Sequence, residues 1–382
     1  MKVIILGGCG IVGSSVARDL IKSKQIKEVI LADIKADSTK LHDSVKNSDK
    51  ASWKSVNVTN FQELVNVMKG SNVVVNTVGP YYKYGIHIMK AALEAGINYV
   101  DVCDDYDVTR VAFDLDEAAI EAGVTICHGF GGAPGTTNLV AKFAADKLDK
   151  VDEIEILWAA GVNDPIGPGA LLHAMHMFSG NVPQYIDGQW VDVPAGSGAE
   201  EVEFLEPTGK AEVFYVGHPE PLTLPRHIKG VKRVVNKGGL LPSFVSRMFM
   251  QFSAHDFFGT TPVIMNGLSI QPRDYLASLL KQAPGFLKQV EPYTTSPSNI
   301  VVKGWEADKR VTYTYRFDGH QAPGTAISAS ICVQMLCRGD IKKKGVLAPE
   351  GCFDDPKIFF TEFARKGFEL TETKTSTMDI KF

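Results

Sequence analysis

The sequence lacks the cysteine pattern of a disulfide-stabilised secreted protein. Its six cysteines are scattered over 382 residues, and no two of them form a C-x-x-C pair. The apolar stretch from Met1 to Gly7 is too short for a secretory signal, and no small-residue cleavage site follows it. Because disulfide frameworks and signal sequences mark secreted chains, we expect a reduced, cytoplasmic protein.

An excess of charge of one sign is also missing. The chain has 40 Lys and Arg residues against 44 Asp and Glu residues, a formal net charge of −4. This balance provides no broad cationic surface, so we expect neither nucleic acid nor anionic lipid as a partner. Glycines and prolines interrupt both long uncharged stretches, 122–141 and 165–186, so neither is predicted to span a membrane as a regular helix.

What the sequence does contain is enough apolar residues, 45%, to exclude a wholly disordered chain. At about 150 residues per domain, the length suggests two or three domains. In the first 150 residues, strand-like runs alternate with helix-like segments, which predicts a doubly wound parallel α/β sheet with right-handed crossovers. The predicted strands are 2–6, 28–33, 53–57, 72–77, 97–102 and 124–128, and the predicted helices include 11–23, 60–69, 84–95 and 108–122.

Beyond about residue 150 the pattern changes to strands separated by longer loops rich in glycine and proline. The segment 311–317 alternates well enough to predict a strand with one solvated or ligand-facing side. We therefore expect an α+β domain with an antiparallel sheet. The mostly apolar segment 324–338 is predicted to be a buried helix. Further strands are predicted at 153–158, 201–204 and 212–216.

Gly8, Gly10 and Gly13 form a G-x-G-x-x-G motif directly after the first predicted strand. Gly8 permits the tight turn, Gly10 lets the backbone approach a pyrophosphate, and Gly13 lets the helix lie close to the strand. The N–H groups at the helix N-terminus supply donors for phosphate. Asp33 closes the second strand about 20 residues further on, where its carboxylate would bind a ribose. A carboxylate there repels a 2′-phosphate and favours NAD, although Lys35 keeps NADP possible.

The carboxyl ends of the later strands are the next candidates, because ligands of open α/β sheets bind there. The small and polar residues of 76–82 suit close passage of a nicotinamide ribose. Asp101, Asp104 and Asp105 follow strand five, and their carboxylates repel one another unless a cation, a donor or solvent compensates. Helix capping is one interpretation for Asp105 and Asp104. The other is a site for a cationic amino group or for proton transfer.

Strand six ends in the glycine-rich run 127–138, which predicts close approach of the backbone to a ligand, with Thr136 or Thr137 capping the next helix. His128 in this run is either a proton-transfer residue or a packed core histidine. His173 and His176 are three residues apart on one predicted helix. No cysteine or carboxylate stands at a matching spacing, so packing or substrate contact is favoured over a metal site.

These motifs, in this order, resemble the saccharopine dehydrogenase family. The resemblance covers most of the chain and is weakest between residues 150 and 310. It rests on the turn from Gly8 to Gly13, on Asn76-x-x-Gly79-Pro80-Tyr81 with Gly85, on Tyr99-Val100-Asp101, on Gly132-Ala133-Pro134-Gly135, and on Gly345-Val346-Leu347-Ala348-Pro349-Glu350.

The resemblance implies a Rossmann domain over 1–130 and an inserted α+β domain for substrate and dimer contacts over 131–322. It also implies C-terminal helices over 323–382 that return to the Rossmann domain. The implied activity is NAD(P)-dependent oxidation of a carbon–nitrogen bond in a long amino acid such as saccharopine or lysine. We expect a homodimer with a small amino-acid substrate. Two alternatives stay open: a carboxynorspermidine-type condensing enzyme and a non-catalytic redox sensor that binds NAD(H).

By the same resemblance, Asp101 and Asp104 match acidic residues of the lysine dehydrogenases, and with His128 they are the predicted catalytic residues. Arg233 is predicted to bind a substrate carboxylate, as Arg often does, although Arg233-Val234-Val235-Asn236 departs from the Arg-Tyr-x-Gly of relatives. The other predicted substrate residues are Tyr81, Pro134, Gly135 and Thr136. The predicted cofactor residues are Gly8, Cys9, Gly10, Ile11, Val12, Gly13, Asp33, Ile34, Val58, Thr77, Val78, Gly79 and Pro80.

Overall fold

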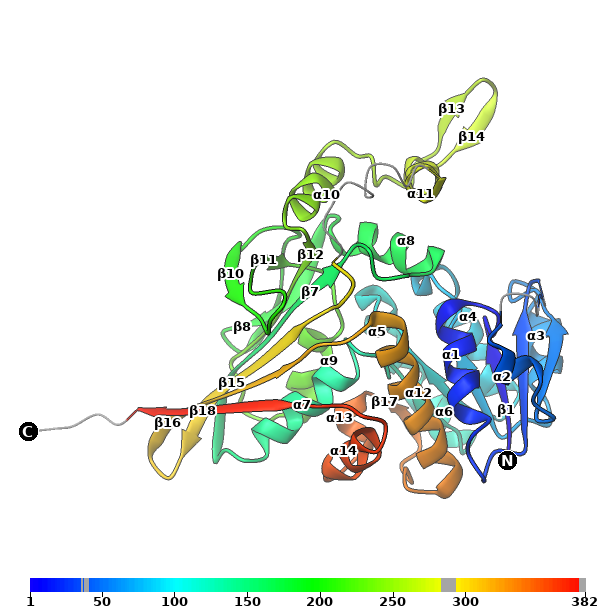
Figure 1. The fold of residues 1–382 in the computed structure, drawn as a ribbon, viewed down its shortest axis with the longest axis horizontal. Coiled ribbons are helices and arrows are strands. Elements are labelled where there is room, and N and C mark those ends of the chain that lie inside the picture. The colour runs from blue at the N-terminus through cyan, green and yellow to red at the C-terminus, as the bar shows by residue number, and fades with distance from the viewer. Residues whose placement is uncertain (36, 38–40, 283–292, 378–382) are drawn as a thin grey trace, which may run out of the picture. The chain divides into compact units, whose positions relative to one another are not determined.

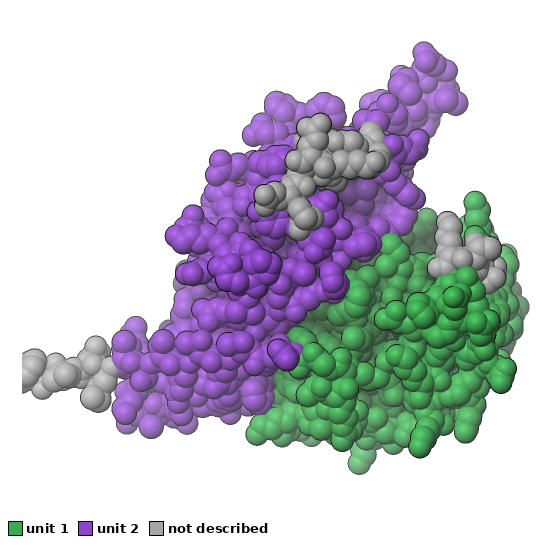
Figure 2. All heavy atoms as spheres, in the orientation of Figure 1, with its two compact units in different colours: residues 1–139, 322–368 green, residues 140–321, 369–382 purple. Residues whose placement is uncertain are grey.

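A computed structural model describes residues 1–35, 37, 41–282 and 293–377 (Figure 1). The chain divides into two compact units, which Figure 2 distinguishes by colour. Unit 1 comprises residues 1–139 and 322–368, and unit 2 comprises residues 140–321 and 369–382. The first segment of unit 1 ends at Leu139, within helix α7 (Thr136–Ala145).

Unit 1 is built on a seven-stranded sheet whose paired strands are all parallel. Its strand order, β3-β2-β1-β4-β5-β6-β17, reverses direction between β1 and β4, which is the topological switch point where such sheets bind ligands. The predicted doubly wound sheet is thus confirmed. Its strands are β1 (Lys2–Leu6), β2 (Glu28–Asp33), β3 (Ala51–Ser55), β4 (Val73–Asn76), β5 (Asn98–Asp101), β6 (Thr125–Cys127) and β17 (Gly345–Leu347).

The helices of unit 1 bury the sheet, which is why its central strands are almost wholly apolar. Val3 to Leu6 of β1 have no exposed surface at all. Local signals set helix boundaries: the side chain of Asn60 accepts a hydrogen bond from the N–H of Glu63 at 3.2 Å and caps α3. The helices are α1 (Ile11–Leu20), α2 (Asp43–Lys46), α3 (Phe61–Met68), α4 (Tyr81–Glu94), α5 (Tyr106–Ala112), α6 (Asp116–Glu121), α12 (Gln321–Arg338), α13 (Pro349–Cys352) and α14 (Lys357–Ala364), with a short 3-10 turn at Phe113–Leu115.

The apolar helix predicted at 324–338 is α12, and it lies in the core of unit 1. Ala329, Ile331, Cys332 and Val333 are 0–1% exposed and pack with β1 and β2 residues in one cluster. A helix that is apolar around most of its circumference must be buried. No helix among the described residues is long and apolar enough to cross a membrane.

Unit 2 contains a nine-stranded mixed sheet. Strands β12 and β7 pair in parallel, and every other pair in this sheet is antiparallel. The strands are β7 (Lys150–Gly161), β8 (Asn181–Ile186), β9 (Gln189–Pro194), β10 (Glu200–Glu203), β11 (Lys210–Tyr215), β12 (Arg233–Leu241), β15 (Ser298–Glu306), β16 (Lys309–Phe317) and β18 (Thr371–Thr377). A separate hairpin joins β13 (Val263–Met265) and β14 (Leu268–Ile270), and the helices are α8 (Pro168–Met177), α9 (Glu220–His227), α10 (Phe244–Ala254) and α11 (Pro272–Gln282).

The C-terminal segment departs from the predicted arrangement. Residues 323–382 were predicted to form helices that return to the Rossmann domain, but Thr371–Thr377 is a strand that pairs with β16 in unit 2. The threonines at 371, 373, 375 and 377 give this segment the β-branched side chains that favour strands. The prediction was therefore wrong for Thr371–Thr377, and residues 378–382 lie outside the described residues.

Candidate functional site

The glycine turn of unit 1 has the geometry of a dinucleotide cradle. A Cβ on Gly8 would lie 2.8 Å from the Cα of Leu31, and a Cβ on Gly13 would lie 2.3 Å from the carbonyl oxygen of Gly7, so both positions require glycine. A Cβ on Gly10 would meet only the oxygen of Gly7, at 3.1 Å. The protein itself therefore leaves space in front of Gly10, which is where a ligand's pyrophosphate would pass.

The donors for such a ligand come from the start of α1. Gly10 is the N-cap residue, so the N–H groups of Ile11, Val12 and Gly13 belong to the first helical turn. A helix offers these groups no acceptor of its own, and its dipole is positive at this end. The turn can thus hold an anionic phosphate with backbone groups alone.

Asp33 lies beside the same turn. Its Oδ2 accepts a hydrogen bond from the N–H of Cys9 at 3.1 Å, which ties the end of β2 to the loop after β1. The carboxylate is half-buried, so it remains able to bind a ribose hydroxyl. Burial, and then the charge of Asp33, raise the pKa of the Cys9 thiol. Ile34 and Lys35, which follow Asp33, are exposed.

The end of β4 supports the glycine turn from the other side of the switch point. The hydroxyl of Thr77 donates to the oxygen of Leu6 at 2.8 Å, and the side chain of Asn76 accepts from the N–H of Val78 at 2.9 Å. The hydroxyl of Tyr81 donates to the oxygen of Asn76 at 2.8 Å. Burial raises the pKa of Tyr81 well above its ordinary value. Tyr81, predicted to bind substrate, therefore uses its hydroxyl within unit 1.

Two of the predicted catalytic residues, Asp101 and His128, bind each other. Nδ1 of His128 lies 3.0 Å from Oδ2 of Asp101, and its Nε2 lies 2.9 Å from the hydroxyl of Thr109. The other oxygen of Asp101 accepts from the N–H of Gly129 at 2.7 Å. Asp101 is 1% exposed and His128 is 2% exposed. Because both ring nitrogens are engaged, this geometry favours a structural role that joins the ends of β5 and β6.

The neighbouring carboxylates of Asp104 and Asp105 are not part of this hydrogen-bonded pair. Asp104 is half-buried, and it stays a predicted proton-transfer residue. Asp105 occupies the N-cap position of α5, but its side chain makes no capping hydrogen bond. Its Oδ2 instead accepts from the N–H of Tyr82 at 2.9 Å, which ties α4 to α5.

Most of the remaining predicted residues of unit 1 lie in loops, and Thr136 is the first residue of α7. Gly135 has φ +119°, and a Cβ there would lie 2.2 Å from the oxygen of Gly131, so only glycine fits. The N–H of Thr136 donates to that same oxygen at 3.0 Å. Pro134 precedes this tight turn, and Val58 packs beside the core on the α3 side. Gly79 and Pro80 lead from β4 into α4.

Arg233, predicted to bind substrate, is engaged by carboxylates of unit 2. Its Nη1 bonds Glu155 at 2.7 Å and also pairs with Glu153, and Lys303 bonds Glu155 at 2.9 Å. Half-burial lowers the pKa of Arg233, but its hydrogen bonds to Glu155 and Tyr215 outweigh this and hold it above its ordinary value. Its charge is thus neutralised within the sheet, which gives no support to a role in binding a substrate carboxylate.

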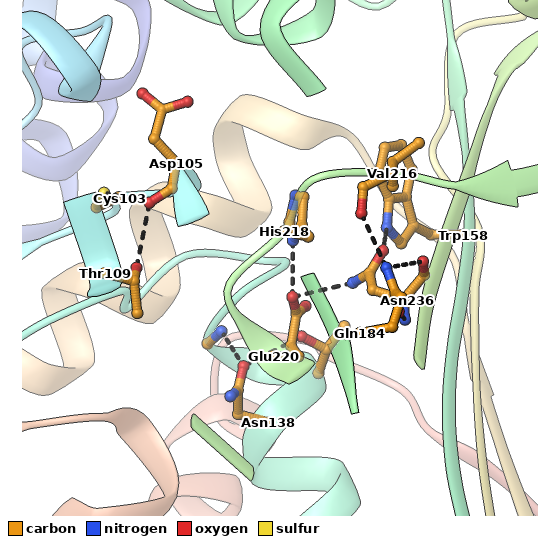
Figure 3. A network of polar contacts seen from close by, with 12 residues as sticks. Cys103, Asp105, Thr109, Asn138, Trp158, Gln184, Val216, His218, Glu220 and Asn236 are labelled. Atoms are coloured by element: carbon orange, nitrogen blue, oxygen red, sulfur yellow. Dashed lines mark hydrogen bonds and ion pairs between the residues drawn. The ribbon is translucent and has the colours of Figure 1, made fainter. Parts of the chain in front are cut away.

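Unit 2 also contains a buried polar network that lies outside the predicted site residues (Figure 3). Nδ1 of His218 lies 2.7 Å from Oε2 of Glu220, and the side-chain amide of Asn236 donates to the same oxygen at 2.9 Å. The indole N–H of Trp158 donates to Asn236 Oδ1 at 2.9 Å. The exposed fraction of His218 is 3%, and that of Glu220 and Asn236 is zero. Gly217-His218-Pro219-Glu220 was the signal, because a histidine two residues before a glutamate can pair with it.

The two histidines of α8 do not share one environment. The ring of His173 packs edge-on against the ring of His218, with 5.5 Å between centroids. Nδ1 of His176 lies 3.4 Å from Nη1 of Arg273. The ring of His173 therefore packs beside the network around His218.

Comparison with known proteins agrees with the geometry of unit 1. Residues 3–127 match the family described as "Saccharopine dehydrogenase NADP binding domain". This match confirms the predicted cofactor at the level of NAD(P). The preference for NAD over NADP stays a prediction.

Curated relatives match only part of the chain. A lipid droplet localized protein of Caenorhabditis elegans is 30% identical over 138 residues, which are 34% of this chain and 32% of that protein. A trans-acting enoyl reductase of Mycobacterium leprae is 24% identical over 157 residues, which are 40% of this chain and 38% of that protein. The chain thus spans less than two fifths of the length of these relatives.

A solved structure is similar over nearly the whole chain. Saccharopine dehydrogenase (L-Glu forming) from Saccharomyces cerevisiae aligns over 98% of this chain and 99% of its own, with a TM-score of 0.68 and 16% identity. At this identity the similarity shows a shared fold.

Proposed function

We propose that the protein is an NAD(P)-dependent oxidoreductase acting on a carbon–nitrogen bond of a long amino acid, because residues 3–127 match the family described as "Saccharopine dehydrogenase NADP binding domain". Saccharopine and lysine are the first substrates to test. The main support for a redox function is the glycine turn. An added Cβ would clash with the protein at Gly8 and Gly13, whereas space remains in front of Gly10. A nicotinamide dinucleotide supplies the hydride chemistry when it is bound.

In this proposal the residues of unit 1 bind and orient the dinucleotide. The N–H groups of Ile11 to Gly13 bind the pyrophosphate, and the carboxylate of Asp33 binds the adenosine ribose. Thr77 fixes the loop after β4 against the turn through its bond to Leu6. Asp104 is the residue of this unit that we propose for proton transfer, because Asp101 is engaged with His128.

A second candidate is reduction of a carbon–carbon double bond. One curated relative is named a trans-acting enoyl reductase, and such a substrate needs no arginine for an amino-acid carboxylate. The pairing of Arg233 with Glu153 and Glu155 favours this alternative, since it neutralises the predicted carboxylate ligand. A carboxynorspermidine-type condensing enzyme, a redox sensor and a cytoplasmic homodimer remain predictions from the sequence.

The experiment is a substrate panel with the purified chain. Saccharopine, lysine and carboxynorspermidine are each mixed with NAD and with NADP, and a 2-enoyl thioester is mixed with each reduced form. Absorbance of the reduced nicotinamide reports turnover. Turnover of an amino acid supports the leading proposal, and turnover of the enoyl thioester alone replaces it with the second. Tight binding of a reduced nicotinamide without any turnover favours the sensor.

A further inference from the structure

The hairpin of β13 and β14 carries an apolar face that nothing covers. Val263 lies opposite Ile270, and Met265 lies opposite Leu268. Because alternate residues of a strand share a face, these four side chains lie on the same side of the hairpin. Val263, Ile264, Met265 and Leu268 are 46–73% exposed. Figure 1 shows the hairpin standing away from the large sheet of unit 2, and within the described ranges no third strand pairs with it. An isolated hairpin is marginally stable in water, so a partner on this face would stabilise it.

The exposed apolar surface continues on the segments that flank the hairpin. The ring of Phe252 in α10 packs on the ring of Phe257, with 5.5 Å between centroids. Nε of Arg273 in α11 donates to the backbone oxygen of Phe258 at 2.8 Å. These contacts join α10, the start of the hairpin segment and α11 into one part of unit 2, which we call the arm region (residues 244–279). Eight large apolar side chains of the arm region are exposed: Phe244, Phe257, Val263, Ile264, Met265, Leu268, Tyr275 and Leu279.

The arm region exposes about as much apolar surface as a stable interface uses. Eight large side chains that are each about half exposed offer on the order of 700 Å². The largest apolar patch of a typical monomeric protein covers about 300–600 Å². A stable complex of standard size buries about 800 Å² on each partner. The arm region therefore has the size of a surface that another folded protein covers.

The charge of the hairpin segment favours a second copy of this chain as that protein. From Phe257 to Pro272 no side chain is charged. A two-fold dimer places the same patch of both copies face to face, so any charge near the axis would meet its own sign. An uncharged segment avoids this repulsion, and it offers a strongly acidic or basic partner no opposite charge.

The backbone of the hairpin argues against a membrane as the occupant. Its tip is Asn266-Gly267, and both residues have positive φ, as a type I′ turn requires. The side-chain amide of Asn266 would therefore enter the bilayer first. Each of the two strands also leaves one edge of N–H and C=O groups unpaired, which is costly in hydrocarbon. A second folded copy can cover the apolar face while these edges pair with it or stay in water.

We propose that the arm region is the surface through which two copies of this chain associate, with the apolar hairpin faces buried in the contact. The inference concerns unit 2 and stands whether or not the proposed redox function does. Interfaces of this size have dissociation constants of about 1 μM or tighter. The chain should therefore be a dimer at about 10 μM.

The decisive variant is Leu268→Asp, measured by sedimentation equilibrium over about 1–100 μM chain. An aspartate at this exposed position has little effect on folding. In the dimer it would place two carboxylates in one apolar contact, so the dissociation constant should rise by about 100-fold or more. Leu268→Met keeps the apolar surface and should remain dimeric. Ile120→Asp is the matched control, because Ile120 is exposed on α6 in unit 1.

Two results would overturn the inference directly. One is a wild-type chain that stays monomeric at 100 μM. The other is a folded L268D variant that dimerises as tightly as the wild type. Thermal unfolding checks that L268D is folded, and Met265→Asp on the same face serves as the second variant.

Hydrogen exchange locates the contact on the chain. Backbone amides of 263–270 should exchange several-fold more slowly at 100 μM than at 1 μM in the wild type and equally at both concentrations in L268D. A wild-type dimer without this protection associates through another surface, which overturns the inference. Flotation with phosphatidylcholine vesicles tests the other occupant: binding of a monomeric wild-type chain that L268D abolishes would assign the arm region to lipid instead. No substrate or cofactor enters these measurements, so failure of the proposed function leaves their outcome unchanged.

Discussion

The sharpest test of the cofactor site is a pair of glycine-to-alanine substitutions in the same turn. Gly10 has φ −74° and ψ 171°, a conformation that alanine adopts freely. Its new Cβ would meet only the oxygen of Gly7, at 3.1 Å. Because alanine also lowers the entropy of the unfolded chain, G10A should be as stable as the wild type or more stable by up to about 1 kcal/mol.

The same methyl group would occupy the path of the pyrophosphate. Inserting a methyl group into a filled space costs about 1–3 kcal/mol, so the Kd of the dinucleotide should rise by about 5- to 150-fold. Gly13→Ala should behave in the opposite way. Its Cβ would lie 2.3 Å from a backbone oxygen, which cannot rotate away, so the free energy of unfolding should fall by about 1–3 kcal/mol.

Isothermal titration calorimetry with NADH and NADPH measures the affinities, and urea unfolding measures the stabilities. Gly324→Ala in α12 is the control, since no atom lies within 4 Å of its added Cβ. Unchanged affinity in G10A would refute the placement of the pyrophosphate at this turn. A G10A variant that is less stable than G13A would refute the steric argument itself.

Three further predictions follow from other residues. Asp33→Ala should weaken NAD binding and relax discrimination against NADP, and calorimetry showing unchanged NAD affinity would exclude the ribose role of Asp33. Asp104→Asn should lower kcat much more than it lowers cofactor affinity, and equal losses in a joint kinetic and binding measurement would remove Asp104 from the proton-transfer residues. Burial raises the pKa of Glu155, but hydrogen bonds from Lys303 and Arg233 outweigh it and hold the pKa below its ordinary value of 4.5. This carboxylate therefore stabilises the fold above about pH 4.5 and loses that contribution as the pH falls through the lowered folded pKa. The difference in unfolding free energy between the wild type and E155Q should be largest near neutral pH and shrink in acid, and urea unfolding with a constant difference across this range would contradict the pairing.

The sequence alone determined the dinucleotide turn and most of the first sheet. The turn is a local structure, because its conformation depends on glycines within six residues and on the strand and helix that flank them. Asp33 could be predicted because the helix and the strand that follow the glycine turn place it about 20 residues after that turn. Strand β3 was predicted two residues late, since its half-buried side chains give a weaker pattern.

Tertiary structure decided the roles of the polar residues. Asp101 and His128 lie 27 residues apart along the chain, and only the pairing of neighbouring strands brings them to 3.0 Å. The sequence position of Arg233 predicted a role in substrate binding. Its carboxylate partners, however, come from β7, about 80 residues earlier.

Strand β12 shows the physical reason most clearly. Gly238 weakens its strand pattern in the sequence, yet a Cβ there would lie 2.3 Å from the indole ring of Trp158. That glycine makes room for the tryptophan whose N–H orients Asn236, and Asn236 in turn helps to hold Glu220 on His218. A backbone turn is encoded by its neighbours in the sequence. A network of buried side chains from four elements exists only once the sheet has brought those elements together.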